Sequence, residues 1–388
     1  MSASPNPARN TSQKARRRIR SFWSRVTEGL ELEQLWGQCL SEAKAGYGFY
    51  SKDVDWDMIE REEKEWKRPF LAAGALFQSL LMKLSPVRRV LLLIAIVLLI
   101  LQPEMRSSGG ASFNLGALGV LILFLLLALE LADRVTMKHD LEIAREIQQW
   151  LVPDRAPYVP GLDIAFATRP QNTVAGDYYD AFLRELAETS GTHPLLIVVA
   201  DVAGRSVPAA LLMATFQASL RALAATPASL KEIGVGLEGY ARAHSLEGRR
   251  FTTAFLAQIN PETREMEYVN AGHNNPLLRR ASGGIERLSI GGQPFGVPLF
   301  AESPIPYPSG HVQLLDGNLL FIFTDGVVEA LGDRDEEFGE ARLLPCILSA
   351  PLESAADTLR RVMGEVNTFV GLVRQHDDIT CLVPRANP

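Results

Sequence analysis

Acidic residues stand at the ends of apolar segments in the second half of the chain, and their positions could support metal chemistry. The segments that carry them are TVAGDYYD, LLIVVAD, LLFIFTDG and QHDDITCLV, and the acids are Asp177, Asp180, Asp201, Asp325, Asp377 and Asp378. Any one of these aspartates fits a turn or a helix cap. Four such sites in one region favour a shared role, because strands can hold carboxylates that are remote in sequence at one point.

Converging carboxylates repel one another unless cations lie among them. Ligand sets made only of oxygen favour Mg²⁺ or Mn²⁺ over zinc or copper, and no His/Cys cluster competes in this sequence. Two such ions suit phosphoester hydrolysis, since they lower the pKa of water and neutralise phosphoryl charge. The sequence therefore predicts hydrolysis by a metal-activated water.

Other phosphate-handling classes lack their signatures here. LLIVVAD is similar to a Walker B strand, but the chain has no G-x-x-x-x-G-K-[ST]. FIFTDG is similar to an aspartyl-phosphate site, but no second aspartate lies two residues after Asp325. The Gly-rich loop, catalytic loop and DFG of a kinase are also missing.

Short apolar segments punctuated by Gly, Pro and Asn position these acids and read as strands. They are LDIAFATR, PLLIVVAD, TTAFLAQIN, REMEYVNAG, NPLLRRA, NLLFIFTD and DDITCLVP. Helices are expected over 208–224, 229–243 and 352–370. Strands in neighbouring pairs with helices grouped between them predict an α+β domain with antiparallel sheets.

The motifs AREIQQWLVPD, GDYYDAF, ADVAGRSVPAALLMA, EYVNAGHNNPLL, GGQPFGV, IFTDGVVEA, FGEARL and HDDITCLV come in one order. In this order the chain, from Ala144 to Pro384, resembles the SpoIIE/RsbU-like branch of the PPM serine/threonine phosphatases. The resemblance implies a PPM-type sandwich of two antiparallel β-sheets flanked by helices. It also implies a centre of two Mn²⁺ or Mg²⁺ ions at one edge of the sandwich.

The same resemblance implies roles for individual residues. Those that would hold the metals and carry catalysis are Asp177, Asp201, Asp325 and Asp377. The main-chain carbonyl of Val202 would add a metal ligand, and the role of Asp378 is left open. Members of the family act on phosphoserine or phosphothreonine in regulatory proteins, often anti-sigma factor antagonists.

The chain departs from the family pattern at three points. Ala175 precedes Gly176 where the family has paired glycines, and Ala203 stands in the serine position of DVSG. Neither change removes a carboxylate. The arginine and histidine that bind phosphate and protonate the leaving group in eukaryotic relatives are not evident. His273 is read as a structural residue that bonds a loop, with catalytic acid as the weaker alternative.

Two uninterrupted apolar runs, 90–101 and 115–129, flank a short polar link. They predict a transmembrane hairpin with spans at about 87–103 and 113–131, the second about 28 Å long against a bilayer core of about 30 Å. A pair of buried helices in a soluble domain is the alternative. Basic residues flank both outer ends, at Lys83, Arg88, Arg89, Arg134 and Lys138, whereas the link carries Arg106 alone. The positive-inside rule predicts a multi-pass protein of the inner (cytoplasmic) membrane with both termini cytoplasmic.

After the second run, residues 133–152 are expected to continue the helix as a stalk. Its apolar positions recur at multiples of a helical turn, at Leu131, Val135, Ile143, Ile147 and Leu151. The stalk could pair two copies as a coiled coil and regulate the helix that follows Asp201; a passive spacer is the alternative.

The N-terminal part carries no catalytic constellation. Its first 26 residues hold a basic cluster without an acid, at Arg9, Lys14, Arg16, Arg17, Arg18, Arg20 and Arg25. By its charge this cluster can lie on anionic lipid or on nucleic acid, and a disordered, soluble tail is the alternative. A net charge of −6 over the 388 residues excludes a general polyanion binder, and membrane lipid rather than nucleic acid is the expected partner. Three scattered cysteines, Cys39, Cys346 and Cys381, suit a reducing compartment.

The expected organisation has four segments: a basic tail and cytoplasmic helical region (1–85), a transmembrane hairpin (86–132), a stalk (133–152) and a PPM-type phosphatase domain (153–388). The expected function is a membrane-anchored phosphatase acting on a phosphorylated regulatory protein. The alternative is a non-catalytic, membrane-bound pseudophosphatase that binds a partner.

Overall fold

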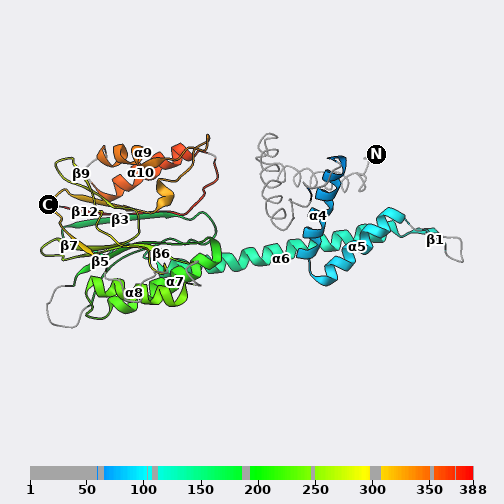
Figure 1. Ribbon diagram of the computed structural model, residues 1–388, viewed down its shortest axis with the longest axis horizontal. Coiled ribbons are helices and arrows are strands. Elements are labelled where there is room, and N and C mark those ends of the chain that lie inside the picture. Colours follow the sequence, from blue (N-terminus) through cyan, green and yellow to red (C-terminus); the bar gives the residue numbers. More distant parts are fainter. Residues whose placement is uncertain are drawn as a thin grey trace, which may run out of the picture. The chain divides into compact units, whose positions relative to one another are not determined.

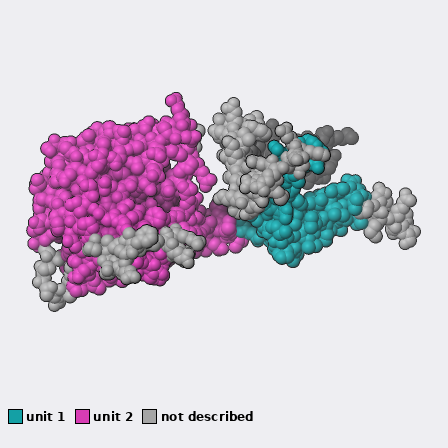
Figure 2. All heavy atoms as spheres, viewed as in Figure 1, with its two compact units in different colours: residues 1–134 teal, residues 135–388 magenta. Residues whose placement is uncertain are grey.

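A computed structural model describes residues 59, 65–102, 104–106, 112–185, 193–245, 250–297, 307–349, 354–371 and 373–387. The basic cluster at the N-terminus and Cys39 lie outside these residues. The chain divides into two compact units, residues 1–134 and 135–388 (Figure 2). The four-segment division expected from the sequence stays a prediction.

The first unit is helical. A short η1 (Glu65–Lys67) leads into α4 (Arg68–Lys83), then α5 (Pro86–Leu101), the paired strands β1 (Glu104–Arg106) and β2 (Ser112–Asn114), and α6 (Gly116–Leu151), which ends in the second unit. Within this unit α5 and α6 contact each other at Gly119, where an added Cβ would lie 3.0 Å from the carbonyl oxygen of Ala95. At the other end of the pair, Arg88 donates to Asp133 at 2.6 Å. These contacts make a helical hairpin of the two apolar runs.

Two of the described helices are long and apolar enough to cross a membrane, α6 and α7 (Ser206–Ala224). The apolar part of α6 leaves large side chains exposed, whereas α7 buries Met213, Phe216 and Leu220 against a sheet. Length and composition alone therefore do not separate a membrane helix from a core helix. The 16 residues of α5 span about 24 Å, short of a bilayer core of about 30 Å.

The second unit is a sandwich, and its described strands form two five-stranded antiparallel sheets. The first sheet has the order β10 (Ser309–Gln313), β7 (Glu265–Ala271), β6 (Thr252–Ile259), β5 (Leu195–Val202) and β4 (Tyr178–Leu183). The second has the order β3 (Leu162–Arg169), β12 (Ile379–Ala386), β11 (Leu319–Phe323), β8 (Leu277–Arg279) and β9 (Ile285–Arg287). The α+β sandwich predicted from the sequence is confirmed.

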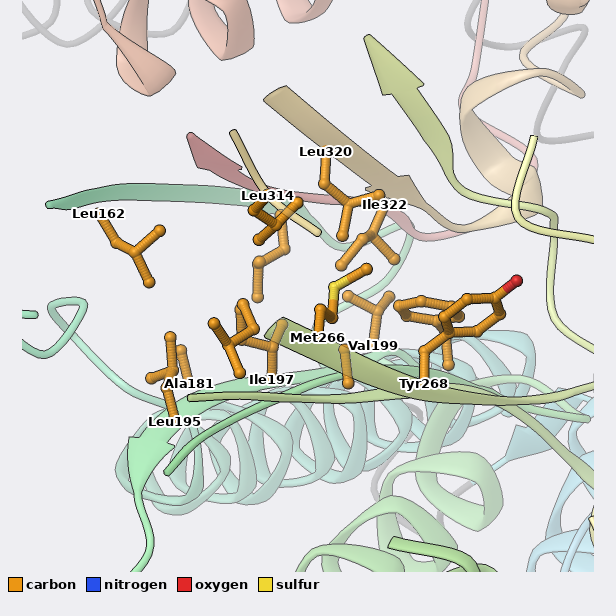
Figure 3. Packing of buried hydrophobic residues seen from close by; sticks show 14 of the residues in the cluster. Leu162, Ala181, Leu195, Ile197, Val199, Met266, Tyr268, Leu314, Leu320 and Ile322 are labelled. Carbon is orange, nitrogen blue, oxygen red and sulfur yellow. The ribbon is translucent and has the colours of Figure 1, made fainter. Parts of the chain in front are cut away.

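The core has three layers because the strands alternate between two buried faces. In β5, Leu195, Ile197 and Val199 enter the layer between the sheets, while the residues between them face the helices. In β11, Leu320 and Ile322 meet them from the facing sheet (Figure 3). Burial on both faces explains why these strands read as continuous apolar runs rather than as alternating patterns.

Helices cover both outer faces of the sandwich (Figure 1). The first sheet packs on α7 and α8 (Leu230–His244), and the second packs on α9 (Gly339–Leu348) and α10 (Ala355–Val370). Ser229 starts α8 with a capping box that includes Glu232, and Ser354 caps α10. The predicted strand segments and three of these helices agree with the structure within a few residues. β4, β9, β10 and α9 were not predicted.

Candidate metal centre

The strand alternation decides which acids face the interior of the sandwich. Asp201 follows Val199 by two residues, and Asp177 precedes Tyr179 by two, so both belong to the faces that form the layer between the sheets. From the second sheet, Asp378 lies four residues before the inward-facing Leu382. Period-two geometry thus aims acids from both sheets at one edge of the same layer.

Asp180 is the exception among the predicted acids, because it faces the opposite side of β4. It is fully buried, accepts a hydrogen bond from the Tyr178 hydroxyl at 2.5 Å, and pairs with Arg221 of α7 at 2.7 Å. The Arg221 guanidinium also lies over the ring of Phe182. Asp180 therefore ties α7 to the sheet.

Asp177 bridges the two sheets. Its carboxylate accepts a hydrogen bond from the Thr324 hydroxyl at 3.0 Å, and Thr324 in turn receives the Thr380 backbone N–H at 3.0 Å. Asp177 is buried, which raises its pKa well above the ordinary value, and the neighbouring charges of Asp201 and Asp378 raise it further. A nearby cation would stabilise the ionised form of this buried carboxyl against the repulsion from its neighbours.

Asp378 holds two loops in place. One oxygen accepts the Gly176 backbone N–H and the other the Gln171 backbone N–H, both at 2.6 Å. Gln375 donates to the Arg169 carbonyl at 2.7 Å and thus links the same loops again. These bonds fix the segment before Asp177 against the segment before β12, which gives the residue left open by the sequence a positioning role.

Two glycines permit the close approach of these segments. A Cβ on Gly326 would lie 1.9 Å from the Asp378 carbonyl oxygen, so only glycine lets the turn after Asp325 pass that backbone. A Cβ on Gly176 would lie 3.2 Å from the carbonyl oxygen of Val202. The Val202 carbonyl oxygen thus lies close to Gly176, the residue before Asp177.

Mutual electrostatic effects join the acids into one cluster. Burial and the charges of Asp325, Asp377, Asp378 and Glu329 raise the pKa of Asp201 to about 7. Burial also raises the pKa of Asp325, with a smaller contribution from Asp377. Asp201 therefore links the four predicted aspartates, because it interacts electrostatically with Asp177 on one side and with Asp325 and Asp377 on the other.

The cluster is loose, however. Among the residues that the structure describes, no group of three or more His, Cys, Asp or Glu side chains is arranged tightly enough to hold a metal ion. The donor set still fits hard divalent cations, since it offers only carboxylate and carbonyl oxygens, and burial first, then neighbouring acids, raise the pKa of Asp177 and Asp201. The assignment of Asp177, Asp201, Val202, Asp325 and Asp377 as ligands stays a prediction.

Glu329 is a member of the cluster that the sequence analysis missed. Its backbone N–H donates to the Asp325 carbonyl at 2.8 Å, one helical turn earlier. Burial first, and then the charges of Asp325, Glu337 and Asp377, raise its pKa. The spacing of four residues between Asp325 and Glu329 in TDGVVEA was the available signal, but Glu329 does not stand at a strand end.

Gln148, near the end of α6, is a second residue whose contact with the site region was not predicted from the sequence. Its side-chain amide accepts the Ala175 N–H at 2.9 Å and donates to the Ala175 carbonyl at 2.7 Å. A cavity of about 440 Å³ beside it is lined by residues of α6, β3 and the Asp177 loop. The end of α6 thus binds the residue two positions before Asp177.

His273 has the surroundings of a structural histidine. It is buried, its Nδ1 lies 3.1 Å from the Thr253 hydroxyl, and its backbone exchanges two hydrogen bonds with the Asn270 side chain. Burial lowers its pKa to about 4, so the ring is neutral at pH 7. A neutral ring holding a loop agrees with the structural interpretation.

The sandwich is similar to known proteins. The family model described as "Stage II sporulation protein E (SpoIIE)" matches residues 191–387. Protein IcfG of Synechocystis is 26% identical over 72% of this chain, and phosphoserine phosphatase RsbU of Bacillus subtilis is 24% identical over 64%. The chain spans 48% of IcfG and 70% of RsbU.

Solved structures support the fold. The SiaA-PP2C domain of Pseudomonas aeruginosa has a TM-score of 0.56 at 21% identity, covering 66% of this chain and 99% of that domain. The PP2C phosphatase domain of SpoIIE from B. subtilis, with a fragment of its regulatory domain, has a TM-score of 0.50 at 16% identity and covers 58% of this chain and 62% of that one.

Proposed function

Because this chain belongs to the SpoIIE family, we propose that it is a metal-dependent phosphatase that removes phosphate from phosphoserine or phosphothreonine. One observation carries the proposal: buried acids from both sheets of the sandwich lie near one another, and their pKa values are raised by burial first and by neighbouring carboxylates second. The relative RsbU, named a phosphoserine phosphatase, supports the choice of reaction.

Asp177, Asp201, Asp325 and Asp377 would hold two Mn²⁺ or Mg²⁺ ions, with the carbonyl of Val202 as a further ligand. Bound there, such ions would neutralise phosphoryl oxygens and lower the pKa of a water molecule. The chain itself orients the acids: Thr324 holds Asp177, Asp378 fixes the two flanking loops, and Gly326 lets Asp325 approach. Such preorganisation lowers the cost of arranging the site during the reaction.

The substrate is proposed to be a phosphorylated regulatory protein, of the kind opposed to an anti-sigma factor. We also propose that the α5–α6 hairpin anchors the chain in the cytoplasmic membrane, with both termini on the cytoplasmic side. The apolar side chains exposed on α5 and on the first part of α6 support contact with lipid.

We further propose that the stalk pairs two copies of the chain and influences the site. Val135, Ile143 and Ile147 are exposed along the part of α6 in the second unit. The sequence suggested action through α7, but the described contact of Gln148 is with Ala175. A signal along the stalk would therefore reach the loop before Asp177 first.

The test is hydrolysis of 4-nitrophenyl phosphate and of a phosphoserine protein by the full chain with Mn²⁺. Activity that a chelator removes and Mn²⁺ restores would support the enzyme. The competing candidate is a non-catalytic, membrane-bound binding module. A folded chain that binds a phosphoprotein but never turns it over would establish that alternative instead.

A further inference from the structure

A small cleft lies beside the acid cluster, with a volume of about 60 Å³. That volume is enough for several water molecules. Side chains of both charges line it, including Arg169, Arg205, Glu329, His376 and Asp377. Asp377, a proposed metal ligand, and Glu329, its neighbour, thus line the same cleft as two arginines.

Arg169, the last residue of β3, is a partly buried cation without an anionic partner. Its guanidinium donates to the side-chain oxygen of Asn367, and its Nε is buried without a hydrogen-bond acceptor. Within the described part of the chain, no carboxylate lies within ion-pair distance of Arg169. Burial lowers its pKa, so the guanidinium has lost hydration that no protein anion replaces.

Arg205 faces the cleft from the opposite segment, directly before α7. Its side chain is exposed, and none of the described residues accepts a hydrogen bond or ion pair from it. It lies four residues after Asp201, so the strand that positions Asp201 also brings Arg205 to the edge of the sandwich. Both arginines therefore line the cleft with hydrogen-bond donors. Without them, the carboxylates would repel an anion from it.

We propose that Arg205 and Arg169 bind the phosphoryl group of the substrate in this cleft, an inference that rests on the proposed phosphatase function. A phosphate monoester carries up to two negative charges and must approach several carboxylates. Guanidinium forks match phosphate oxygens in two parallel hydrogen bonds, which an ammonium group cannot reproduce. The arginines thus supply the phosphate contact that the sequence appeared to lack.

The experiment uses the full chain, purified in detergent, as wild type, Arg205→Ala, Arg205→Lys and Arg169→Gln. The control is Arg360→Ala, which removes an exposed arginine of α10 paired with Asp357. KM and kcat for 4-nitrophenyl phosphate and the inhibition constant of inorganic phosphate are measured with Mg²⁺. Arg205→Ala should raise KM and the inhibition constant about 10- to 100-fold, the effect of losing a charge-assisted contact.

Arg205→Lys should recover only part of the loss, because it restores the charge without the fork. Arg169→Gln should act in the same direction, and Arg360→Ala should match the wild type. Unchanged KM and phosphate inhibition in both Arg205→Ala and Arg169→Gln, with an active wild type, would overturn the inference and leave the proposed function standing.

A wild type that hydrolyses neither 4-nitrophenyl phosphate nor the phosphoserine protein would contradict the proposed function. A second measurement then tests whether the cleft binds phosphate. Inorganic phosphate should raise the thermal unfolding midpoint of the Mg²⁺-loaded wild type, because a ligand of the native state stabilises it. Loss of this shift in Arg205→Ala but not in Arg360→Ala would support phosphate binding in the cleft. An equal shift in both variants, or none in the wild type, would refute it.

Discussion

The helical unit and the sandwich use the same residue types in opposite ways. In the helical unit, apolar side chains of α5 and α6 point outward, and the ion pair of Arg88 with Asp133 lies at the end of the hairpin. In the sandwich, apolar residues fill three buried layers and the acids gather at one edge. An apolar helix is therefore a lipid-facing candidate or a core element according to what covers it, which its composition does not reveal.

The sharpest test of this contrast places a charge on the buried face and on the exposed face of α7. Met213→Lys introduces a cation at a fully buried position of α7, where burial without a partner is very costly. We expect the sandwich to lose cooperative thermal unfolding and the chain to lose its folded yield. Leu211→Lys on the same helix, at a side chain 64% exposed, should change stability by no more than about 0.5 kcal/mol. Similar damage from both variants would show that α7 is covered on its outer face as well.

A second test separates the acids of the cluster from ordinary surface acids. Asp201→Asn removes a charge proposed to hold a metal, a contribution of several kcal/mol, so hydrolysis should fall by at least about 10³-fold while the fold is kept. Asp316→Asn, at an exposed aspartate paired with Arg264, should retain wild-type rates. Comparable rates for Asp201→Asn and wild type would exclude the proposed centre.

The raised pKa of Asp201 predicts how the metal-free sandwich responds to pH. Its carboxyl has a pKa of about 7 in the fold against about 3.8 when unfolded, so the folded state holds the proton more tightly. The stabilisation is complete below about pH 4 and is lost as pH rises through 7, by up to about 4 kcal/mol. Chelated wild type should therefore unfold at lower denaturant at pH 8 than at pH 5. Asp201→Asn should show a smaller difference between these two pH values, and an identical difference would contradict the shift.

A charge in α6 should change the membrane association of the chain and leave the stability of the sandwich unchanged. Phe124→Lys, at a side chain 66% exposed in the apolar part of α6, should oppose membrane insertion by about 2.5–3.5 kcal/mol. We expect less of the chain in the membrane fraction and an unchanged unfolding midpoint of the sandwich. Phe124→Leu is the matched control and should stay in that fraction. A wild type that is fully soluble would reject the anchor.

The smallest effect concerns the place where α6 meets the site. Gln148→Ala removes both hydrogen bonds to Ala175 and leaves the backbone N–H and carbonyl of Ala175 without these partners. The change should lower the free energy of unfolding by about 1–3 kcal/mol. Sandwich stability should fall, and turnover should fall several-fold because the loop before Asp177 loses its anchor. The neighbouring exposed Gln149→Ala should have little effect on either measurement. Equal effects from the two glutamines would mean that α6 only covers the surface.

Local signals in the sequence were sufficient to predict most of the helices and strands. Apolar runs ending in turn residues predicted strands such as β5 and β11, because a strand buried on both faces must be continuously apolar. β4 was missed because its residues, YYDAFL, mix polar and aromatic groups, and the short edge strands β9 and β10 carry little apolar signal.

By itself, the sequence determined the antiparallel sandwich, the apolar hairpin and the acids at strand ends, since hydrophobic periodicity and turn chemistry act over a few residues. Only the tertiary structure decided that Asp177 faces the layer between the sheets while Asp180 faces α7, that Glu329 joins the cluster, and that Gln148 bonds the Ala175 backbone. These facts depend on strand register and on contacts between residues up to about 200 positions apart, such as that of Asp378 with Gly176. Such contacts are set by the packing of whole sheets, which no local pattern encodes.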